Sequence, residues 1–164
     1  MFADCRHRIH SMTPIHQNLY QSEGLAQIDV GAYLQHLART LFRAYAINPE
    51  HVQLSVCVDN VRLTLDTAVP CALIRNELLS NCLKHAFPHE QAGHIWVTFC
   101  REPDGTLRLC VRDDGVGFPE GTDFQTTNSF GLQLVRLLAR QLRATVAQER
   151  HPGTSVTLTF VEPA

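Results

Sequence analysis

The spacing of apolar residues changes from a helical period to strict alternation at Val52. Before this point Leu34, Leu37 and Leu41 recur three or four residues apart, as on one face of a helix, whereas every second residue from 52 to 58 is apolar. Both periods recur further along the chain. Helical and strand segments that are segregated in this way predict an α+β fold, a two-layer sandwich with helices on one face of a mixed, mostly antiparallel sheet.

The predicted elements run in the order two helices, two strands, helix, two strands, loop, helix, two strands. Pro14 should bend the first helix, and Asp29 is a candidate N-cap of the second. Asp59-Asn60 separates two alternating runs, which predicts a hairpin, and the central helix is entered through Pro70. The predicted helices are 4–21, 30–46, 69–85 and 130–142, and the predicted strands are 52–58, 61–65, 94–101, 106–112, 144–148 and 155–161.

Size and composition favour one main domain with a helical appendage. The chain has 164 residues, 45% of them apolar, and a formal charge of −2 without a long basic run. This charge argues against a nucleic-acid or membrane-surface partner. No apolar stretch approaches the roughly 20 residues needed to span a bilayer, and the N-terminus lacks the apolar core of a signal peptide. We therefore expect a soluble, cytoplasmic chain.

Five of the six cysteines lie in apolar runs rather than in a disulfide pattern. We expect reduced, buried thiols in a cytoplasmic protein, at Cys57, Cys71, Cys82, Cys100 and Cys110. Cys82 and His85 are one helical turn apart, but two ligands fall short of the three or four that a zinc site needs.

The predicted central helix carries a polar face. At about 100° per residue, Glu77, Asn81 and Lys84 fall within roughly 60° of one another, and Lys84 is the only lysine of the chain. The apolar residues Ile74, Leu78, Leu79, Cys82 and Leu83 lie on the opposite arc. Asparagine can join waters and phosphate oxygens around Mg²⁺, lysine can bind phosphate, and glutamate can take or steer a proton. The alternative is an ordinary solvated helix face.

Two later clusters complete the candidate site. Asp113 ends a predicted strand, where its carboxylate could accept a hydrogen bond from the adenine amine, and Gly115 and Gly117 allow close backbone approach. An ordinary turn would explain the same residues. Ser129 opens the helix at 130–142, whose free N–H groups favour phosphate, although Ser129 could simply cap that helix. The chain has neither GxxxxGK[ST] nor GxGxxG.

Four motifs, in order, resemble the ATP-binding (Bergerat-fold) domain of sensor histidine kinases and its gyrase, heat-shock-chaperone and mismatch-repair relatives: NELLSNCLKHAF, DDGVGFP, SFGLQLV and PGTSVTLTF. The resemblance covers about 52–161 and implies a Mg²⁺-dependent ATP site with a mobile lid at 121–128. It implies that Glu77 assists phosphoryl transfer, Asn81 binds Mg²⁺ and Asp113 reads adenine. The remaining implied ATP-site residues are Lys84 and His85 at the phosphates, with Gly115, Gly117, Phe118, Ser129, Gly131, Leu132 and Thr154. Ser129 replaces a glycine of many members, which implies a stiffer lid.

The N-terminal segment is similar to the end of the dimerisation region in one class of histidine kinases. That class carries its phosphate-accepting histidine on the first helix of a hairpin, and we expect this chain to begin after it, with His7, His10 and His16 on the second helix. The expected organisation is 1–48 for partial dimerisation and linker helices and 49–164 for the ATP-binding domain.

The predicted function is therefore the ATP-binding catalytic domain of a two-component sensor histidine kinase. It would transfer the γ-phosphate of ATP to a histidine outside this chain, with that acceptor helix and a response regulator as partners and a homodimer as a possible state. Two alternatives stay open. One is an anti-sigma-factor-like protein serine kinase, which the ending NCLKHAF also resembles, and the other is a non-catalytic, ATP-gated interaction module.

Overall fold

A computed structural model describes the chain from Ile28 onward with short gaps. The described residues are 28–45, 48, 50–59, 61–118, 124, 126, 127, 129–150 and 152–162. The predicted helix at 4–21, its bend and the three N-terminal histidines lie outside the described residues.

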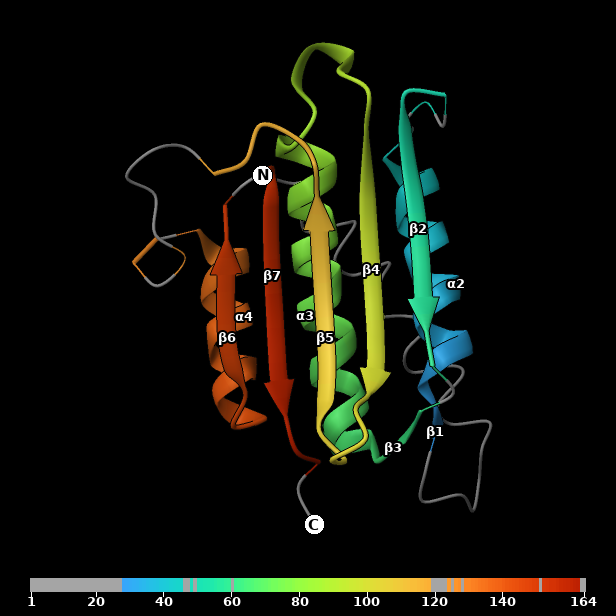
Figure 1. Cartoon of the computed structure of the whole chain (residues 1–164), viewed down its shortest axis with the longest axis vertical. Coiled ribbons are helices and arrows are strands. Elements are labelled where there is room, and N and C mark those ends of the chain that lie inside the picture. Colours follow the sequence, from blue (N-terminus) through green and yellow to red (C-terminus); the bar gives the residue numbers. More distant parts are fainter. Residues whose placement is uncertain are drawn as a thin grey trace.

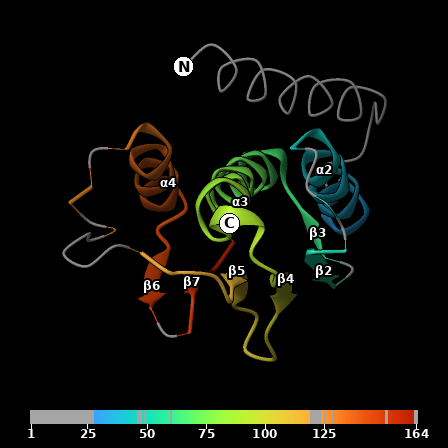
Figure 2. The ribbon, with the colours of Figure 1, turned by 90° about the horizontal axis from the view of Figure 1, so that it is seen from above.

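A five-stranded sheet with three helices on one face makes up most of the described part of the fold, together with a separate two-stranded sheet (Figure 1). Figure 2 shows the helices side by side on the same side of the strands. The α+β two-layer prediction is confirmed. The strands are β2 (Val52–Val58), β4 (Gly93–Arg101), β5 (Leu107–Asp113), β6 (Thr145–Glu149) and β7 (Thr154–Phe160), in the order β2-β4-β5-β7-β6. The helices are α2 (Val30–Ala44), α3 (Leu65–His85) and α4 (Phe130–Gln141), with a short 3₁₀ turn at Pro88–Glu90.

The predicted hairpin at 52–65 is wrong. β2 pairs parallel with β4, from Val52 opposite Gly93 to Val58 opposite Phe99. The second half of the expected hairpin is β3 (Arg62–Leu63), which pairs antiparallel with β1 (Ile28–Asp29). Parallel neighbours need a long crossover connection, and β3 with α3 provides it between β2 and β4.

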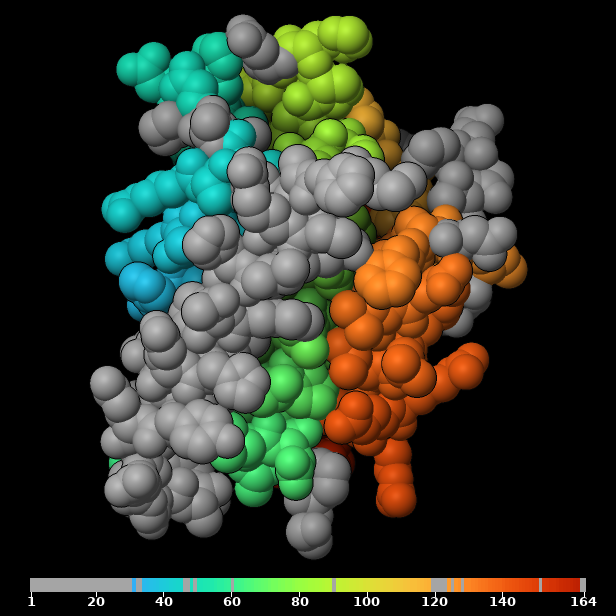
Figure 3. Space-filling view, turned by 180° about the vertical axis from the view of Figure 1, so that it is seen from behind, coloured from blue at the N-terminus to red at the C-terminus, as the bar shows by residue number. Residues whose placement is uncertain are grey.

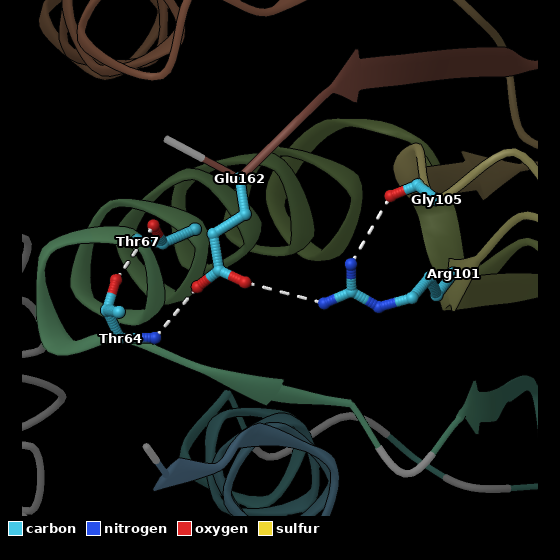
Figure 4. Close-up of polar contacts among 5 residues, drawn as sticks. All are labelled: Thr64, Thr67, Arg101, Gly105 and Glu162. Atoms are coloured by element: carbon cyan, nitrogen blue, oxygen red, sulfur yellow. Dashed lines mark hydrogen bonds and ion pairs between the residues drawn. The ribbon is translucent and has the colours of Figure 1, made fainter. Parts of the chain in front are cut away.

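The central helix α3 begins at Leu65, five residues before Pro70, so proline is not at its entrance but inside the helix. The start is set by Thr64, whose carbonyl accepts from the amides of Thr67 and Ala68. The Thr64 amide donates to Glu162 Oε1 at 2.9 Å, as Figure 4 shows. A carboxylate is favourable at a helix N-terminus, so the contact with Glu162 stabilises an earlier start than the local sequence indicates.

Helix α3 is buried on more sides than its apolar stripe predicts. Seen from behind, its side chains lie between those of α2 and α4 (Figure 3). Arg75, Asn76 and Glu77 are buried together with the apolar side, so the expectation of one open polar face is wrong for Glu77. The flanking helices cover both flanks of α3, which a helical wheel of one element does not reveal. None of the helices that the structure describes has the length and apolar content needed to cross a bilayer.

The face of the sheet opposite the helices carries mixed side chains. Trp96 stacks on His94 with ring centroids 4.2 Å apart, and the Arg112 guanidinium lies 5.2 Å from the Trp96 ring. Ser55 Oγ and His94 Nε2 are 2.7 Å apart. Cys57 is exposed on β2, so the expectation of burial is wrong there, because its position in the alternation faces outward. Cys71 and Cys82 are buried as predicted, whereas Cys100 and Cys110 are only partly buried, and the cysteines of the described residues are free thiols.

Candidate functional site

A cavity of about 410 Å³ lies where the C-terminal half of α3 meets the ends of β5 and β7 and the start of α4. Its walls come from segments far apart in the sequence, because β5 and β7 are neighbours in the sheet and α4 packs against α3. The residues that line it are Leu78, Asn81, Cys82, His85, Ala86, Val111, Asp113, Val116, Gly117, Phe118, Thr127, Ser129, Leu132, Thr154 and Val156.

Asp113 is the buried charge of this cavity, with 2% of its surface exposed. Its Oδ1 accepts hydrogen bonds from the backbone amides of Gly115 at 3.0 Å and Thr154 at 3.2 Å. Burial raises the pKa of Asp113, while the hydrogen bonds that it accepts from the Gly115 and Thr154 amides act in the opposite direction. A buried carboxylate held in this way can accept an N–H donor of a ligand.

The α3 wall brings polar groups to the same cavity. Asn81 and His85 are one turn apart on α3 and both line it. Cys82 lies between them in sequence and also lines the cavity. Burial and the nearby Asp113 charge raise the pKa of Cys82 well above its ordinary value. Cys82 is therefore a protonated thiol rather than a thiolate.

The two glycines of the DDGVGFP segment are required for different structural reasons. Gly117 has φ +74° and lines the cavity, which agrees with the predicted need for an unusual backbone conformation. Gly115 instead faces the end of α3, where an added Cβ would lie 2.1 Å from the Ala86 carbonyl oxygen. The amide of Val116 donates to that same oxygen at 2.9 Å. The strand end and the helix end are thus joined directly.

The N-terminus of α4 forms the opposite wall. Ser129 Oγ accepts from the Leu132 amide at 3.3 Å, so Ser129 caps the helix, and both residues also line the cavity. Arg136 of α4 donates to the carbonyls of Phe124 at 2.6 Å and Thr127 at 3.0 Å. The predicted lid at 121–128 is described only at 124, 126 and 127, and its other residues lie outside the described part.

Most of the predicted site residues meet at this cavity, namely Asn81, His85, Asp113, Gly117, Phe118, Ser129, Leu132 and Thr154. Glu77, Lys84, Gly115 and Gly131 do not line it. The Lys84 ammonium lies 5.8 Å from the ring centroid of Tyr45 instead. Ser80, one turn earlier on α3, contacts the Tyr45 hydroxyl at 2.5 Å, so this side of α3 faces the end of α2.

The sequence reasoning missed Cys82 and the apolar lining of the cavity. It assigned Cys82 to the core arc because it centred the polar face on Glu77, Asn81 and Lys84. A wheel centred on Asn81 and His85 puts Leu78, Cys82 and Ala86 beside the cavity. It also missed Val111, Val116 and Val156, which carry no polar signal of their own, and it placed Thr127 only in the predicted lid.

Two family models match this chain. Residues 68–164 match the model described as "Histidine kinase-, DNA gyrase B-, and HSP90-like ATPase", and residues 1–45 match one described as "Histidine kinase".

Histidine kinases are also found among similar curated proteins and solved structures. Blue-light-activated histidine kinase 2 of Erythrobacter litoralis is 31% identical over 117 residues, which cover 71% of this chain and 33% of that protein. Sensor histidine kinase PdtaS of Mycobacterium tuberculosis is 33% identical over 100 residues, covering 58% of this chain and 20% of PdtaS. This chain thus spans a third or less of these relatives. The histidine kinase domain of Erythrobacter litoralis EL346 has a TM-score of 0.86 at 26% identity, covering 94% of this chain and 73% of that one.

The match to the first family model covers more than half of the chain, and the cavity lies within the matched residues. The strands and helices around it agree with the histidine kinase domain structure. The chain therefore belongs to the histidine kinase-, DNA gyrase B- and HSP90-like ATPase family and carries the ATP-binding catalytic domain of a sensor histidine kinase.

Proposed function

We propose that this chain binds Mg²⁺-ATP in the cavity between α3, α4 and the ends of β5 and β7. In the complete reaction the γ-phosphate then passes to a histidine on a separate dimerisation helix. The observation that carries the proposal is Asp113, a buried carboxylate whose Oδ1 is occupied by two backbone amides. Its remaining acceptor positions suit a base that presents an N–H donor.

The base end of the site selects adenine by hydrogen-bond polarity. The exocyclic amine of adenine donates to the Asp113 carboxylate, whereas the guanine carbonyl at the same position would meet negative charge. The apolar residues Val111, Val116 and Val156 line the same cavity and suit the faces of a planar ring. Both features support adenine over guanine.

The phosphate end is assigned to Asn81, His85 and the start of α4. Mg²⁺ commonly keeps several waters and takes few protein ligands beside phosphate oxygens, so a single amide oxygen from the half-buried Asn81 fits such a site. The described residues hold no cluster of three or more histidine, cysteine or acidic side chains that would form a protein-only metal site. The ion would offset phosphate charge. The N–H groups at the start of α4 favour an anion.

Two further roles belong to the same proposal. Glu77 assists proton handling during transfer, and it is buried one turn before Asn81. Lys84 contacts the phosphates after its side chain leaves the Tyr45 ring. The flexible stem of lysine permits such a movement.

Titration calorimetry with Mg²⁺-ATP tests the proposal on the full chain. Wild type should bind ATP and prefer it to GTP, because Asp113 accepts from the adenine amine. Asp113→Asn should weaken ATP binding at least tenfold, since an amide offers fewer acceptor positions to the base. Asn81→Asp should weaken Mg²⁺-ATP and abolish transfer to an added acceptor-helix protein. Gln141→Ala, at an exposed position of α4 outside the cavity, is the control. Wild-type protein without ATP binding would contradict the proposal.

The chemistry of the product separates this function from the alternatives. Phosphohistidine is lost in acid, whereas phosphoserine survives, and a non-catalytic module forms neither. The relatives named above are histidine kinases, so the serine kinase and the non-catalytic module are not favoured.

The wider organisation is also proposed. We assign 1–48 to dimerisation and linker helices, in line with the family match at 1–45, and 49–164 to the ATP-binding domain. A homodimer, a response regulator as the next phosphate acceptor and a cytoplasmic location complete the proposal. The free cysteines of the described residues suit a reducing compartment.

A further inference from the structure

A second groove lies at the β2 edge of the sheet, apart from the ATP-site cavity. Its volume is about 410 Å³. It runs between Arg39 and Arg43 of α2 and the first half of β2, with His94 of β4 beside it. None of the residues that line this groove also lines the ATP-site cavity. It is therefore a separate feature of the surface.

Strand β2 is an edge strand without the usual protection. Among the described residues it pairs only with β4, and the pairing is continuous from Val52 to Val58, without a bulge. The strand contains neither proline nor a charged residue, whereas the opposite edge strand, β6, ends in Glu149. Bulges, prolines and charges normally prevent a further strand from adding to an edge. The outer side of β2 thus presents backbone N–H and C=O groups that another strand can pair with.

The charge beside this edge comes from α2. Arg39 and Arg43 are exposed, and neither guanidinium pairs with a carboxylate in the part of the chain that the structure describes. Residues four apart in a helix are about 6 Å apart along its axis, and alternate residues of a strand are roughly 7 Å apart. Helix α2 runs alongside β2 (Figure 1). Two carboxylates on one face of an added strand would therefore match the two guanidinium groups.

The same charges argue against a second copy of this chain as the added strand. Two copies joined through their β2 edges would bring four guanidinium groups together, because each copy contributes Arg39 and Arg43. Like charges brought together at an interface oppose binding. The groove is lined by no acidic side chain that could offset them. The charge favours an acidic partner.

We propose that the groove at the β2 edge binds an extended acidic segment of a partner protein, which adds to the sheet as a sixth strand beside β2. Backbone hydrogen bonds to β2 provide affinity that does not depend on sequence. Carboxylates at alternate positions of the segment pair with Arg39 and Arg43 and provide selectivity. The inference does not depend on the ATP site.

Fluorescence anisotropy with labelled peptides of about eight residues, a typical strand length, tests the proposal on the full chain. The first peptide alternates threonine and glutamate. The second replaces each glutamate by lysine, and the third keeps the first sequence but is methylated at every backbone nitrogen. Wild type should bind the first peptide, and should bind each of the other two about tenfold or more weakly, because one has the wrong charge and the other has no N–H donors.

Variants of the two arginines test the source of the selectivity. Arg39→Gln and Arg43→Gln should each weaken binding of the threonine–glutamate peptide by about twofold to fivefold, the range of exposed ion pairs, and the double variant should weaken it further. The matched control is the double variant Arg62→Gln with Arg140→Gln, which removes the same charge at exposed positions outside the groove. It should bind the peptide like wild type. Thermal unfolding shows whether each variant folds, and the single variants replace the double variant should it not fold.

Each alternative has its own outcome. Equal binding of the lysine peptide, or equal losses in the control variant, would overturn the acidic selectivity. Undiminished binding of the methylated peptide would overturn strand addition and leave only an anion-binding surface. Tighter binding of a peptide that copies residues 52–58 would make a second copy of the chain the occupant. Calorimetry with Mg²⁺-ATP should give wild-type affinity in the Arg39 and Arg43 variants, and joint loss of ATP and peptide binding would also overturn the proposal. Wild type that binds the acidic peptide but not ATP would instead contradict only the proposed function.

Discussion

At the residue scale, the buried charge of Asp113 lowers the stability of the fold but serves ligand binding. Its carboxylate is almost fully buried, and burial outweighs the two backbone hydrogen bonds that it accepts, so its pKa is raised. The adjacent Asp114 raises the pKa further. Buried charge costs folding free energy, and the same charge provides the acceptor for the base. The site is therefore a position where binding opposes stability.

This conflict predicts a pH-dependent stability difference between wild type and Asp113→Asn. A raised pKa in the folded state means that the folded protein binds the proton more tightly than the unfolded chain does. Relative to the variant, wild type is therefore most favoured below the unfolded pKa of the carboxyl and loses that advantage as pH rises through the folded pKa. Asp113→Asn should raise the melting temperature at pH 7 by a few degrees, and the gain should shrink as pH falls. Thermal unfolding between pH 4 and 8 measures it. A gain that grows toward low pH would contradict the assigned shift.

Lys84 gives a second prediction at the residue scale. Its ammonium lies near the Tyr45 ring and outside the cavity lining. If it reaches the phosphates on binding, Lys84→Ala should weaken ATP more than adenosine, because only ATP carries the phosphate charge. Calorimetry with both ligands decides this. Equal losses, or none, would restrict Lys84 to its contact with Tyr45.

At the element scale, α3 is held by the sheet at both of its ends. At the N-terminal end, the Thr64 amide donates to Glu162, which follows β7 (Figure 4). At the C-terminal end, the Ala86 carbonyl accepts from the Val116 amide, just after β5. Asn81 and His85 lie close to this second attachment. Their distance from Asp113 is thus set by a helix that strand residues fix at each end.

The first attachment predicts a graded loss of stability. Glu162→Ala should cost about 1–2 kcal/mol, because the Thr64 amide loses its acceptor at the helix start. Glu162→Gln keeps an oxygen acceptor and should cost less. Arg101 pairs with Glu162 at 3.4 Å while 41% exposed, so Arg101→Gln should cost under about 1 kcal/mol. Urea unfolding of the three variants measures the order. An Arg101 variant as unstable as Glu162→Ala would assign the stabilisation to the ion pair instead.

At the scale of the whole molecule, the cavity depends on close contact between the two layers. Gly115 lies at this contact, where a Cβ would meet the Ala86 carbonyl oxygen at 2.1 Å. Backbone atoms cannot rotate away as a side chain can. The end of α3 and the end of β5 can therefore lie this close together only because residue 115 has no side chain.

Gly115→Ala should cost about 1–3 kcal/mol through overpacking and should also weaken ATP binding, because the Gly115 amide donates to Asp113. Gly105→Ala is a matched control. Gly105 has φ +87° with nothing within 4 Å of an added Cβ, so only backbone strain of roughly 1–2 kcal/mol applies there, and ATP affinity should stay unchanged. Unfolding and calorimetry on both variants test the distinction. Unaltered ATP affinity in Gly115→Ala would contradict it.

Local sequence patterns predicted where the helices and strands lie better than they predicted which elements pair with each other. Alternation and turn residues located β4, β5, β7 and α4 within one or two residues, because each depends on neighbours in sequence. The parallel pairing of β2 was missed, since the period of a strand does not specify which strand lies beside it. The start of α3 was missed because its acceptor, Glu162, lies 98 residues away. In the site, motif residues were identified by type, while Cys82 required knowledge of which side of α3 faces the sheet.

The single tryptophan of the chain lies on the open face of the sheet, between the His94 ring and the Arg112 guanidinium. Arg112 directly precedes Asp113, and the His94 amide donates to Asp114 at 2.6 Å. The indole therefore contacts two residues, His94 and Arg112, that lie beside the end of β5, where Asp113 is located. With excitation that selects tryptophan over the three tyrosines, the emission comes from this one position, and changes at the strand end can be followed in it without any attached dye.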